Sequence, residues 1–226
     1  MIFDLDSDIT FPPAVYAEAD GLLAIGGDLS VERLLNAYSS GIFPWFNQKD
    51  PILWWSPNPR PIIIPGKMRM TKSLAKLIKS NVFSLSIDKS FEAVIEACAK
   101  TLREGKAGTW ITTEMKNAYV SLHKMGFCHS VEAWKDGKLV GGLYGVALGK
   151  AFFGESMFHS ESNASKVAFY HLSEFLAIND FHFIDGQVSN PHLISLGAIE
   201  IDREDFLRRL QKALKFTTDN KIWKDN

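Results

Sequence analysis

Two acidic residues in apolar surroundings are the groups in this sequence most suited to chemistry. The first is Glu155, in the run 151–158, and its large apolar neighbours along the chain are Phe152, Phe153, Met157 and Phe158. An ionised carboxylate there must be paired, protonated or turned towards water, because burial of an unpaired charge is costly. A strand whose glutamate simply faces solvent is the plainest alternative.

The second acid, Asp185, ends another short apolar run and is followed by Gln187 and Asn190. Two strands that each end near a buried acid could bring both carboxylates into one cleft. Other chemistries fit less well. The six histidines lack metal-binding spacing, Ser156 is not in a G-x-S-x-G elbow, and the glycines of 21–27 match neither phosphate-loop pattern. We therefore expect no metal site.

The composition indicates a globular protein with ordinary charge. Of the 226 residues, 46% are hydrophobic and 23% are charged, and no apolar run approaches the roughly 20 residues of a membrane-spanning helix. The start of the chain carries acids and lacks a basic signal-peptide region, and there are only two cysteines, so we expect the cytoplasm. The net charge of -1 gives no overall attraction to nucleic acid, so any such contact needs a local patch.

The elements that must position the acids follow from periodicity and turn signals. Residues 139–148 and 151–158 are predicted to form a hairpin about Gly149 and Lys150, and residues 128–134 a further strand joined through Asp136-Gly137. Helices are expected at 71–79, 90–100, 114–125, 163–179 and 206–216, and further strands at 62–65 and 83–87. The sequence thus predicts an α+β fold.

Residues 1–62 differ from the remainder in their density of proline and tryptophan, and we expect them to form a separate small domain before a larger one at 63–226. Ser30 is a candidate N-cap for a helix at 31–39, and some of the aromatic residues should face a ligand or the second domain.

A basic helix face is the one local patch that the sequence offers to nucleic acid. Lys72, Lys76 and Lys79 recur at i, i+4 and i+7 of the helix expected at 71–79. A solvated face is the commoner meaning of such spacing, and contact with a phosphate backbone is the alternative.

Several ordered motifs resemble those of the bacterial leucyl/phenylalanyl-tRNA–protein transferases, and the resemblance runs from about residue 11 to about residue 210. They are Gly41-Ile-Phe-Pro-Trp-Phe, Trp54-Trp55-Ser-Pro, Gly108-Thr-Trp-Ile-Thr, His129-Ser-Val-Glu, Gly154-Glu-Ser-Met-Phe and Asp185-Gly-Gln-Val-Ser-Asn-Pro-His-Leu-Ile-Ser-Leu-Gly. The sequence departs from some members at Phe153, Gly186 and Pro191, which affects the expected shape of the pocket.

The resemblance implies a small N-terminal domain attached to a GNAT-like (acetyltransferase-related) mixed-sheet domain, in a cytoplasmic, monomeric enzyme without a cofactor. Such an enzyme moves Leu or Phe, and less well Met, from aminoacyl-tRNA to the N-terminal Arg or Lys of a protein, which marks that protein for N-end-rule degradation.

The resemblance also assigns roles to residues. Asp185 is expected to orient or polarise Gln187 beside the attacking amine, and Glu155 to hold the cationic acceptor. Lys72, Lys76 and Lys79 match basic positions and would bind tRNA. The terminal adenine would stack on aromatic rings, and a side-chain slot would lie beside the acids; the substrate-binding candidates are Tyr38, Trp45, Trp110, Tyr119, Phe152, Phe153, Met157, Phe158, Ile184 and Asn190.

Two other functions remain as alternatives. A non-catalytic module that binds aminoacyl-tRNA or peptide would not need the acids. An acetyl-CoA-dependent N-acetyltransferase would need a pyrophosphate-binding loop before a helix, where this chain instead has Glu161-Ser-Asn-Ala-Ser.

Overall fold

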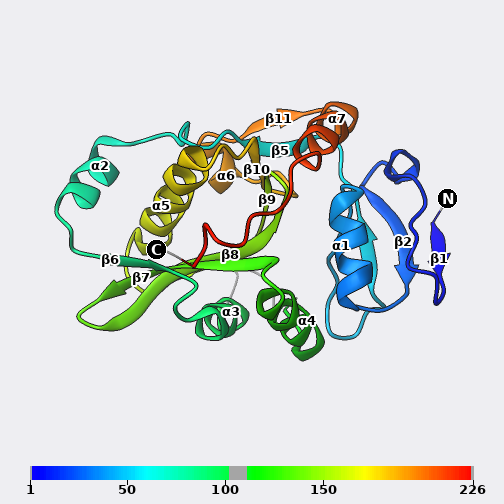
Figure 1. The fold of residues 1–226 in the computed structure, drawn as a ribbon, viewed down its shortest axis with the longest axis horizontal. Coiled ribbons are helices and arrows are strands. Elements are labelled where there is room, and N and C mark those ends of the chain that lie inside the picture. Colours follow the sequence, from blue (N-terminus) through cyan, green and yellow to red (C-terminus); the bar gives the residue numbers. More distant parts are fainter. Residues whose placement is uncertain (1, 102–110, 225–226) are drawn as a thin grey trace.

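The computed structural model describes residues 2–101 and 111–224. Two sheets organise this part of the chain (Figure 1). The smaller has the order β1-β2-β4-β3. Its elements are β1 (Phe3–Leu5), β2 (Leu22–Gly26), β3 (Phe43–Pro44) and β4 (Leu53–Trp55), together with the 3-10 turn η1 (Ala14–Tyr16) and helix α1 (Val31–Ser39).

The larger sheet has the order β11-β5-β10-β9-β8-β7-β6. Its strands are β5 (Arg60–Ile63), β6 (Ser84–Ile87), β7 (Cys128–Lys135), β8 (Lys138–Leu148), β9 (Ala151–His159), β10 (Phe183–Asp185) and β11 (Ile199–Ile201). The pairing of β9 with β10 is parallel and the other pairings are antiparallel. The expected α+β class with a mixed sheet is confirmed.

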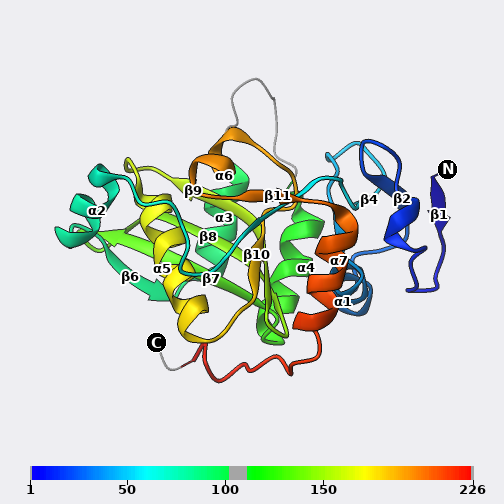
Figure 2. The same cartoon turned by 90° about the horizontal axis from the view of Figure 1, so that it is seen from above.

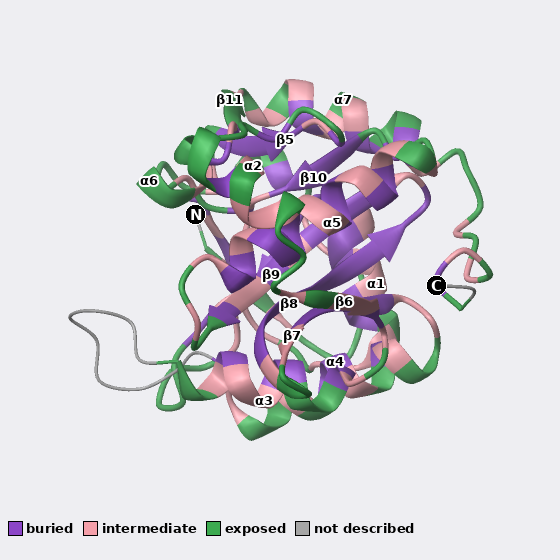
Figure 3. Ribbon diagram, turned by 90° about the vertical axis from the view of Figure 1, so that its left-hand side faces the viewer, coloured by how far each residue is buried: buried purple, intermediate pink, exposed green. Residues whose placement is uncertain are grey.

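Helices cover both faces of this sheet. They are α2 (Lys72–Lys79), α3 (Phe91–Lys100), α4 (Thr113–Lys124), α5 (Ala164–Ile178), α6 (Pro191–Ser195) and α7 (Arg203–Ala213). Figures 1 and 2 place α5 on one face and α3 and α4 on the other, with the N-terminal sheet at the end of the molecule beside α1, α4 and α7. The central strands β8, β9 and β10 are mostly buried between these layers, and the outer helix faces are exposed (Figure 3).

The core is divided accordingly into two clusters. Helix α5 packs through Val167, Leu172 and Leu176 in one cluster, and α3 and α4 pack in the other together with the N-terminal residues Leu34 and Trp54. Burial of Phe91, Val94, Ile95 and Cys98 confirms the inward face expected for the helix at 90–100. No helix in the described part of the chain is long and apolar enough to span a membrane.

Local signals account for most of the elements. Ser30 caps α1 by accepting a hydrogen bond from Arg33 N at 3.3 Å, as expected. The turn at Asp136 and Gly137, with φ of 51° and 75°, closes the β7–β8 hairpin, because both central residues of such a turn need positive φ. The hairpin about Gly149 and Lys150 is also confirmed.

One element begins earlier than expected, and the difference matters for the site. The strand expected at 62–65 is β5, which starts at Arg60, because Arg60 pairs with Ile201 of β11. That partner is far away in the sequence, so the local pattern could not reveal the pairing.

Candidate active site

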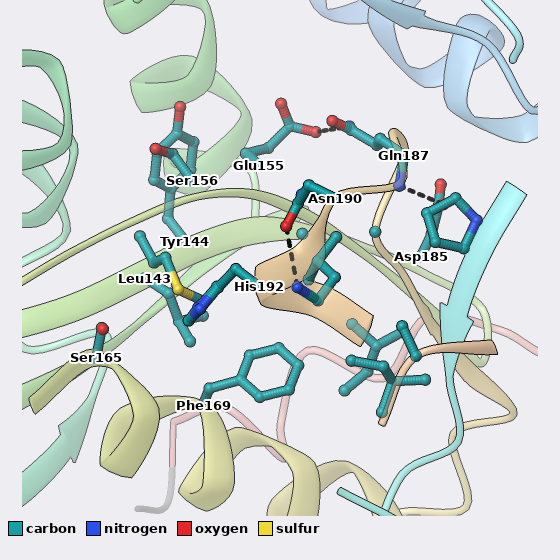
Figure 4. Close-up of a pocket in the computed structure, with 18 of the residues that line it drawn as sticks. Leu143, Tyr144, Glu155, Ser156, Ser165, Phe169, Asp185, Gln187, Asn190 and His192 are labelled. Carbon is teal, nitrogen blue, oxygen red and sulfur yellow. Dashed lines mark hydrogen bonds between the residues drawn. The ribbon is translucent and has the colours of Figure 1, made fainter. Parts of the chain in front are cut away.

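A cavity of about 800 Å³ opens where the two acid-bearing strands cease to pair (Figure 4). Strands β9 and β10 pair only from Phe183 opposite Ala151 to Asp185 opposite Phe153. The residues that follow on each strand, 154–157 and 186–188, line the cavity. The expectation that two strands bring Glu155 and Asp185 into one cleft is therefore confirmed.

Glu155 occupies a β-bulge. On the neighbouring strand Tyr144 is opposite Ser156 but Gly145 is opposite Gly154, so Glu155 has no partner in the ladder. A side chain at Gly145 could not be accommodated, since its Cβ would lie 2.2 Å from the Phe153 carbonyl oxygen. An extra residue in one strand reverses the alternation of side chains beyond it and re-aims the residue at the bulge.

The pattern of burial along β9 shows that reversal. Phe153 and Phe158 belong to the same core cluster, and Phe152 and Met157 to the other, although five residues separate each pair. In a regular strand, residues five apart point to opposite faces. The bulge thus lets Glu155 turn towards the N-terminal domain while Met157 stays on the cavity side.

Three donors surround the buried Glu155 carboxyl group. Its Oε1 accepts from the Tyr38 hydroxyl at 2.7 Å and from Gln187 Nε2 at 2.6 Å, and its Oε2 accepts from the Tyr119 hydroxyl at 2.8 Å. Burial raises the pKa of Glu155 to about 7, and these three hydrogen bonds oppose the rise. A carboxyl group with such a pKa exists in both protonation states near neutral pH.

The two tyrosines also contact each other, with their hydroxyl oxygens 2.5 Å apart. Two hydroxyl protons cannot occupy three oxygen–oxygen contacts at once. When Glu155 is protonated, its own proton supplies the third. Burial, together with the Glu155 charge, raises the pKa of both Tyr38 and Tyr119 well above the usual value, so both stay protonated.

The placement of Tyr38 excludes it from the aromatic rings expected to stack on the terminal adenine. Its side chain is fully buried, packed against Phe153 at 5.1 Å between ring centroids, and offers no face on which a base could stack. Tyr119 is likewise buried. What both contribute to the site is a hydroxyl group directed at Glu155.

Asp185 acts on the backbone of Gln187 rather than on its amide side chain. Its Oδ1 accepts from Gln187 N at 2.8 Å, and Gln187 has the left-handed φ of 62°, which is strained for a residue other than glycine. The amide side chain binds Glu155 instead. The expected link from Asp185 to Gln187 therefore has a different form: the acid holds the strained turn that presents the glutamine.

Arg60 is a site residue that the sequence analysis missed. Its Nε and Nη2 bind the two Asp185 oxygens at 2.8 and 2.7 Å, and its Nη1 donates to the Gly41 carbonyl at 3.2 Å. The guanidinium lies between the rings of Phe43 and Phe206, 4.8 and 4.4 Å from their centroids. An arginine inside the run Arg60-Pro-Ile-Ile-Ile was the available signal, because a cation beside a buried strand needs a buried acid.

The apolar part of the cavity contains three of the predicted slot residues, Phe152, Met157 and Ile184. Leu143 of β8 and two α5 residues, Phe169 and Leu172, complete it and were not predicted. Phe153, also predicted for the slot, and Phe158, predicted as a substrate contact, pack in the opposite core cluster and do not line the cavity. The sequence could not show which face of the strand points inward.

The remaining predicted substrate contacts differ in their placement. Trp45 lines the cavity and lies edge-on to Trp55, with ring centroids 5.9 Å apart. Asn190 also lines it, and its Oδ1 caps α6 by accepting from Leu193 N at 2.9 Å. Trp110 lies outside the described residues.

The three lysines expected to bind tRNA are all exposed on α2, at the end of the molecule opposite the N-terminal sheet (Figure 1). Lys72, Lys76 and Lys79 do not line the cavity. Any role for them therefore concerns the body of a large ligand and not the reacting group.

One group among the described residues could hold a metal ion, away from this cavity. Asp88, His123 and His129 each place one ligand atom within 4.8 Å of the others. Their ring nitrogens already have partners: His129 Nδ1 lies 2.7 Å from Asp88 Oδ2, and His123 Nδ1 lies 2.7 Å from the Cys128 carbonyl. Because His129 also stacks on Trp223, this group ties the C-terminal segment to the sheet.

Comparisons with known proteins point to one family. The family model for the leucyl/phenylalanyl-tRNA protein transferase matches residues 62–211, and the model for the N-terminal domain of that family matches residues 27–58. A leucyl/phenylalanyl-tRNA–protein transferase of Desulfatibacillum aliphaticivorans is 54% identical over 222 residues, which are 98% of this chain and 95% of that protein. One of Nitrosospira multiformis is 52% identical over 225 residues, 99% of this chain and 97% of that protein.

Solved structures resemble the chain only distantly. A GCN5-related N-acetyltransferase from Kribbella flavida has a TM-score of 0.40 at 11% identity, with 74% of this chain and 59% of that chain covered. L-PGS from Bacillus licheniformis has a TM-score of 0.40 at 10% identity, with 75% and 54% covered. These likenesses are too weak to bear on function. The family models and the relatives of about half identical sequence decide the matter: the chain belongs to the leucyl/phenylalanyl-tRNA protein transferase family.

Proposed function

We propose that this protein transfers leucine or phenylalanine from aminoacyl-tRNA to the N-terminal Arg or Lys of an acceptor protein. Membership of the family supports the reaction. The feature of the site that supports it best is a buried carboxyl group, Glu155, with a pKa of about 7, hydrogen-bonded to Gln187 beside an apolar slot. Such products are substrates for N-end-rule degradation.

The reaction needs an uncharged amine, a place for its proton and a fixed position for two substrates. The amine nitrogen attacks the ester carbonyl carbon, the new C–N bond forms, and the bond from that carbon to the ribose oxygen breaks. The amine proton passes finally to the ribose oxygen, which leaves as a hydroxyl group of the tRNA. Because the ester is already activated, positioning supplies much of the rate.

Gln187 and Glu155 fit these needs together. Gln187 gives an N–H to Glu155, so its side-chain oxygen remains to accept an N–H of the attacking amine. The Glu155 carboxylate stabilises the positive charge that develops on that amine, and a pKa near 7 also suits it to accept the proton. The second role adds to the electrostatic one that we expected from the sequence. Asp185 and Arg60 keep the Gln187 turn in place.

We propose partners that suit the shape of the molecule. An apolar slot beside the acids would hold the leucyl or phenylalanyl side chain, Trp45 would stack on the terminal adenine, and the exposed lysines of α2 would contact the tRNA backbone. The protein would act as a monomer in the cytoplasm. We also propose that residues 1–62 and 63–226 form separate domains.

The test is transfer from charged tRNA to peptides that begin with Arg, Lys or Ala, followed by mass spectrometry. We expect N-terminally extended Arg and Lys peptides and an unmodified Ala peptide. A non-catalytic binding module would extend none of them, and an acetyltransferase would add an acetyl group from acetyl-CoA instead.

Comparison of donor amino acids tests the apolar slot more directly than comparison of acceptor peptides. Leucyl- and phenylalanyl-tRNA should be used well, methionyl-tRNA less well, and valyl- and isoleucyl-tRNA poorly, because branching at Cβ crowds the entrance to the slot. One methylene of misfit is worth about 1–3 kcal/mol, so the difference should be about 10- to 200-fold in kcat/KM. Equal rates with valyl- and leucyl-tRNA would contradict this use of the cavity.

The pH dependence of transfer should carry the titration of Glu155. With the unprotonated carboxylate as the active form, kcat/KM should rise as the pH passes through about 7 and then level off. The acceptor α-amine, with a pKa of about 8, adds a second rise. In Glu155→Gln the rise near 7 should vanish while the rise near 8 remains, so the two are separable by the pH profiles of both proteins.

A further inference from the structure

A cationic rim lies on the same cavity as the acids. His159 at the end of β9, Lys166 in the first turns of α5 and His192 of α6 all line it, as do Ser162 and Ser165. Figure 4 shows His192 and Ser165 on the side of the cavity that α5 and α6 form, away from Glu155. The mechanism proposed above uses none of these side chains.

The ionisable side chains on this rim are all basic. Burial lowers the pKa of His192, and the positive charges of Lys166 and His159 lower it further, with no carboxylate among the causes. The nearby Glu161 is bound by Lys135 Nζ at 3.1 Å. In the described part of the chain, no carboxylate lies within ion-pair distance of Lys166. Lys166 is thus a cation without a counter-charge beside a cleft and attracts an anion, and the imidazole rings beside it offer N–H donors.

The start of α5 adds hydrogen-bond donors. This helix has fifteen residues, and its N-cap, Asn163, has a φ of 64° and makes no capping hydrogen bond with its side chain. The first N–H groups of a helix carry partial positive charge and lack helical partners. Ser165, 4% exposed, lines the cavity together with its neighbour Lys166. A serine hydroxyl on the cavity wall can donate a hydrogen bond to an anion there.

We propose that Lys166, His159 and His192, with Ser165 and the start of α5, form a subsite for a phosphate group of the tRNA 3′ end. The inference rests on the proposed function, because it takes the ligand to be an aminoacyl nucleotide. The 5′-phosphate of the terminal adenosine is the anion nearest to the reacting ester in such a substrate. The subsite would hold it by charge and hydrogen bonds, without contact to a base.

This subsite and the lysines of α2 would contact different parts of the tRNA. Those side chains are exposed outside the cavity and can meet only the body of the tRNA. The rim residues share the cavity with the reacting groups, so they can fix the ester relative to Gln187. A phosphate held at a set distance from the ester would also exclude free amino acids and their simple esters as donors.

The test compares two stable analogues, 3′-deoxy-3′-(L-leucylamino)adenosine with and without a 5′-phosphate, by isothermal titration calorimetry at one ionic strength. Wild-type protein should bind the phosphorylated analogue at least about tenfold more tightly. Lys166→Met and His192→Gln should each reduce that preference, and together bring it to within about twofold, while affinity for the unphosphorylated analogue is unchanged.

Two controls locate the effect. Lys212→Met removes an exposed lysine on α7 and should leave the preference intact. Replacing Lys72, Lys76 and Lys79 by Ala should weaken full leucyl-tRNA but neither analogue, whereas Lys166→Met should weaken leucyl-tRNA and the phosphorylated analogue alike.

The outcomes separate the two proposals. If wild-type protein binds both analogues equally, the subsite is excluded and the proposed function is untouched. A preference for phosphate that survives loss of Lys166 and His192 places the phosphate elsewhere and also overturns the inference. If neither analogue binds, the proposed function itself fails.

Discussion

Replacing Arg60 by methionine should destabilise the protein by about 3–5 kcal/mol, because it leaves the fully buried Asp185 carboxylate without its partner. The loss should exceed that of an ordinary ion pair, since Arg60 also binds the Gly41 carbonyl and packs between Phe43 and Phe206. Urea unfolding followed by circular dichroism gives the free energy of unfolding. Transfer activity should fall too, because Gln187 loses its support.

The matched control is Arg209→Met, which removes a partly exposed ion pair with Asp205 and should cost about 1 kcal/mol or less. The double variant Arg60→Met with Asp185→Leu tests the cause. It removes the unpaired charge, so it should recover much of the stability of the single variant and none of its activity. A double variant no more stable than Arg60→Met would show that the packing of the guanidinium, and not the charge of Asp185, dominates.

Glu155→Gln should lower kcat/KM for transfer by about 10²- to 10⁴-fold, the usual worth of a positioned proton acceptor. The substitution keeps the size of the side chain but removes the carboxylate next to Gln187. Affinity for leucyl-tRNA should hardly change, because the role that we propose for Glu155 is directed at the amine of the acceptor. Single-turnover transfer and tRNA binding, measured separately, distinguish the two quantities, and equal losses in both would make Glu155 a binding residue only.

Glu155→Gln should also be more stable than the wild type at pH values where the buried Glu155 carboxyl group is ionised. Folding raises the pKa of Glu155 from 4.5 to about 7, so the folded state loses stability as the pH rises through that interval, by up to about 3 kcal/mol above it. Glu155→Gln should therefore unfold at a higher temperature than wild type at pH 8, and show little gain at pH 5. Glu96→Gln, a change at an ion-paired surface carboxylate, is the control and should not be stabilised at pH 8.

The sequence was sufficient for features that depend on local pattern. The hairpins, the helix capped by Ser30 and the inward face of α3 follow from turn residues, an N-cap and periodicity, and the convergence of Glu155 and Asp185 follows from two apolar runs that each carry one acid. The acids were recognisable because an unpaired charge in an apolar run is costly to bury.

Features that depend on distant partners could not be predicted. Arg60 and Asp185 are 125 residues apart, and their pairing requires β5 and β10 to be neighbours in the sheet. The direction of Tyr38 towards Glu155 likewise depends on where the N-terminal domain packs. The cavity wall from α5 was missed because a buried helix shows apolar residues on several sides and its pattern does not identify the side that faces a ligand.

With the role proposed for Glu155, its bulge makes the length of one strand a marker of activity. Because Glu155 takes up one residue outside the ladder, a relative with one residue fewer between the positions of Phe153 and Met157 could keep every sheet partner and lose the inward carboxyl group. Such a protein would fold and keep its apolar slot, yet lack the catalytic arrangement. Counting residues in this strand therefore offers a way to separate working members of the family from descendants that have retained only the fold.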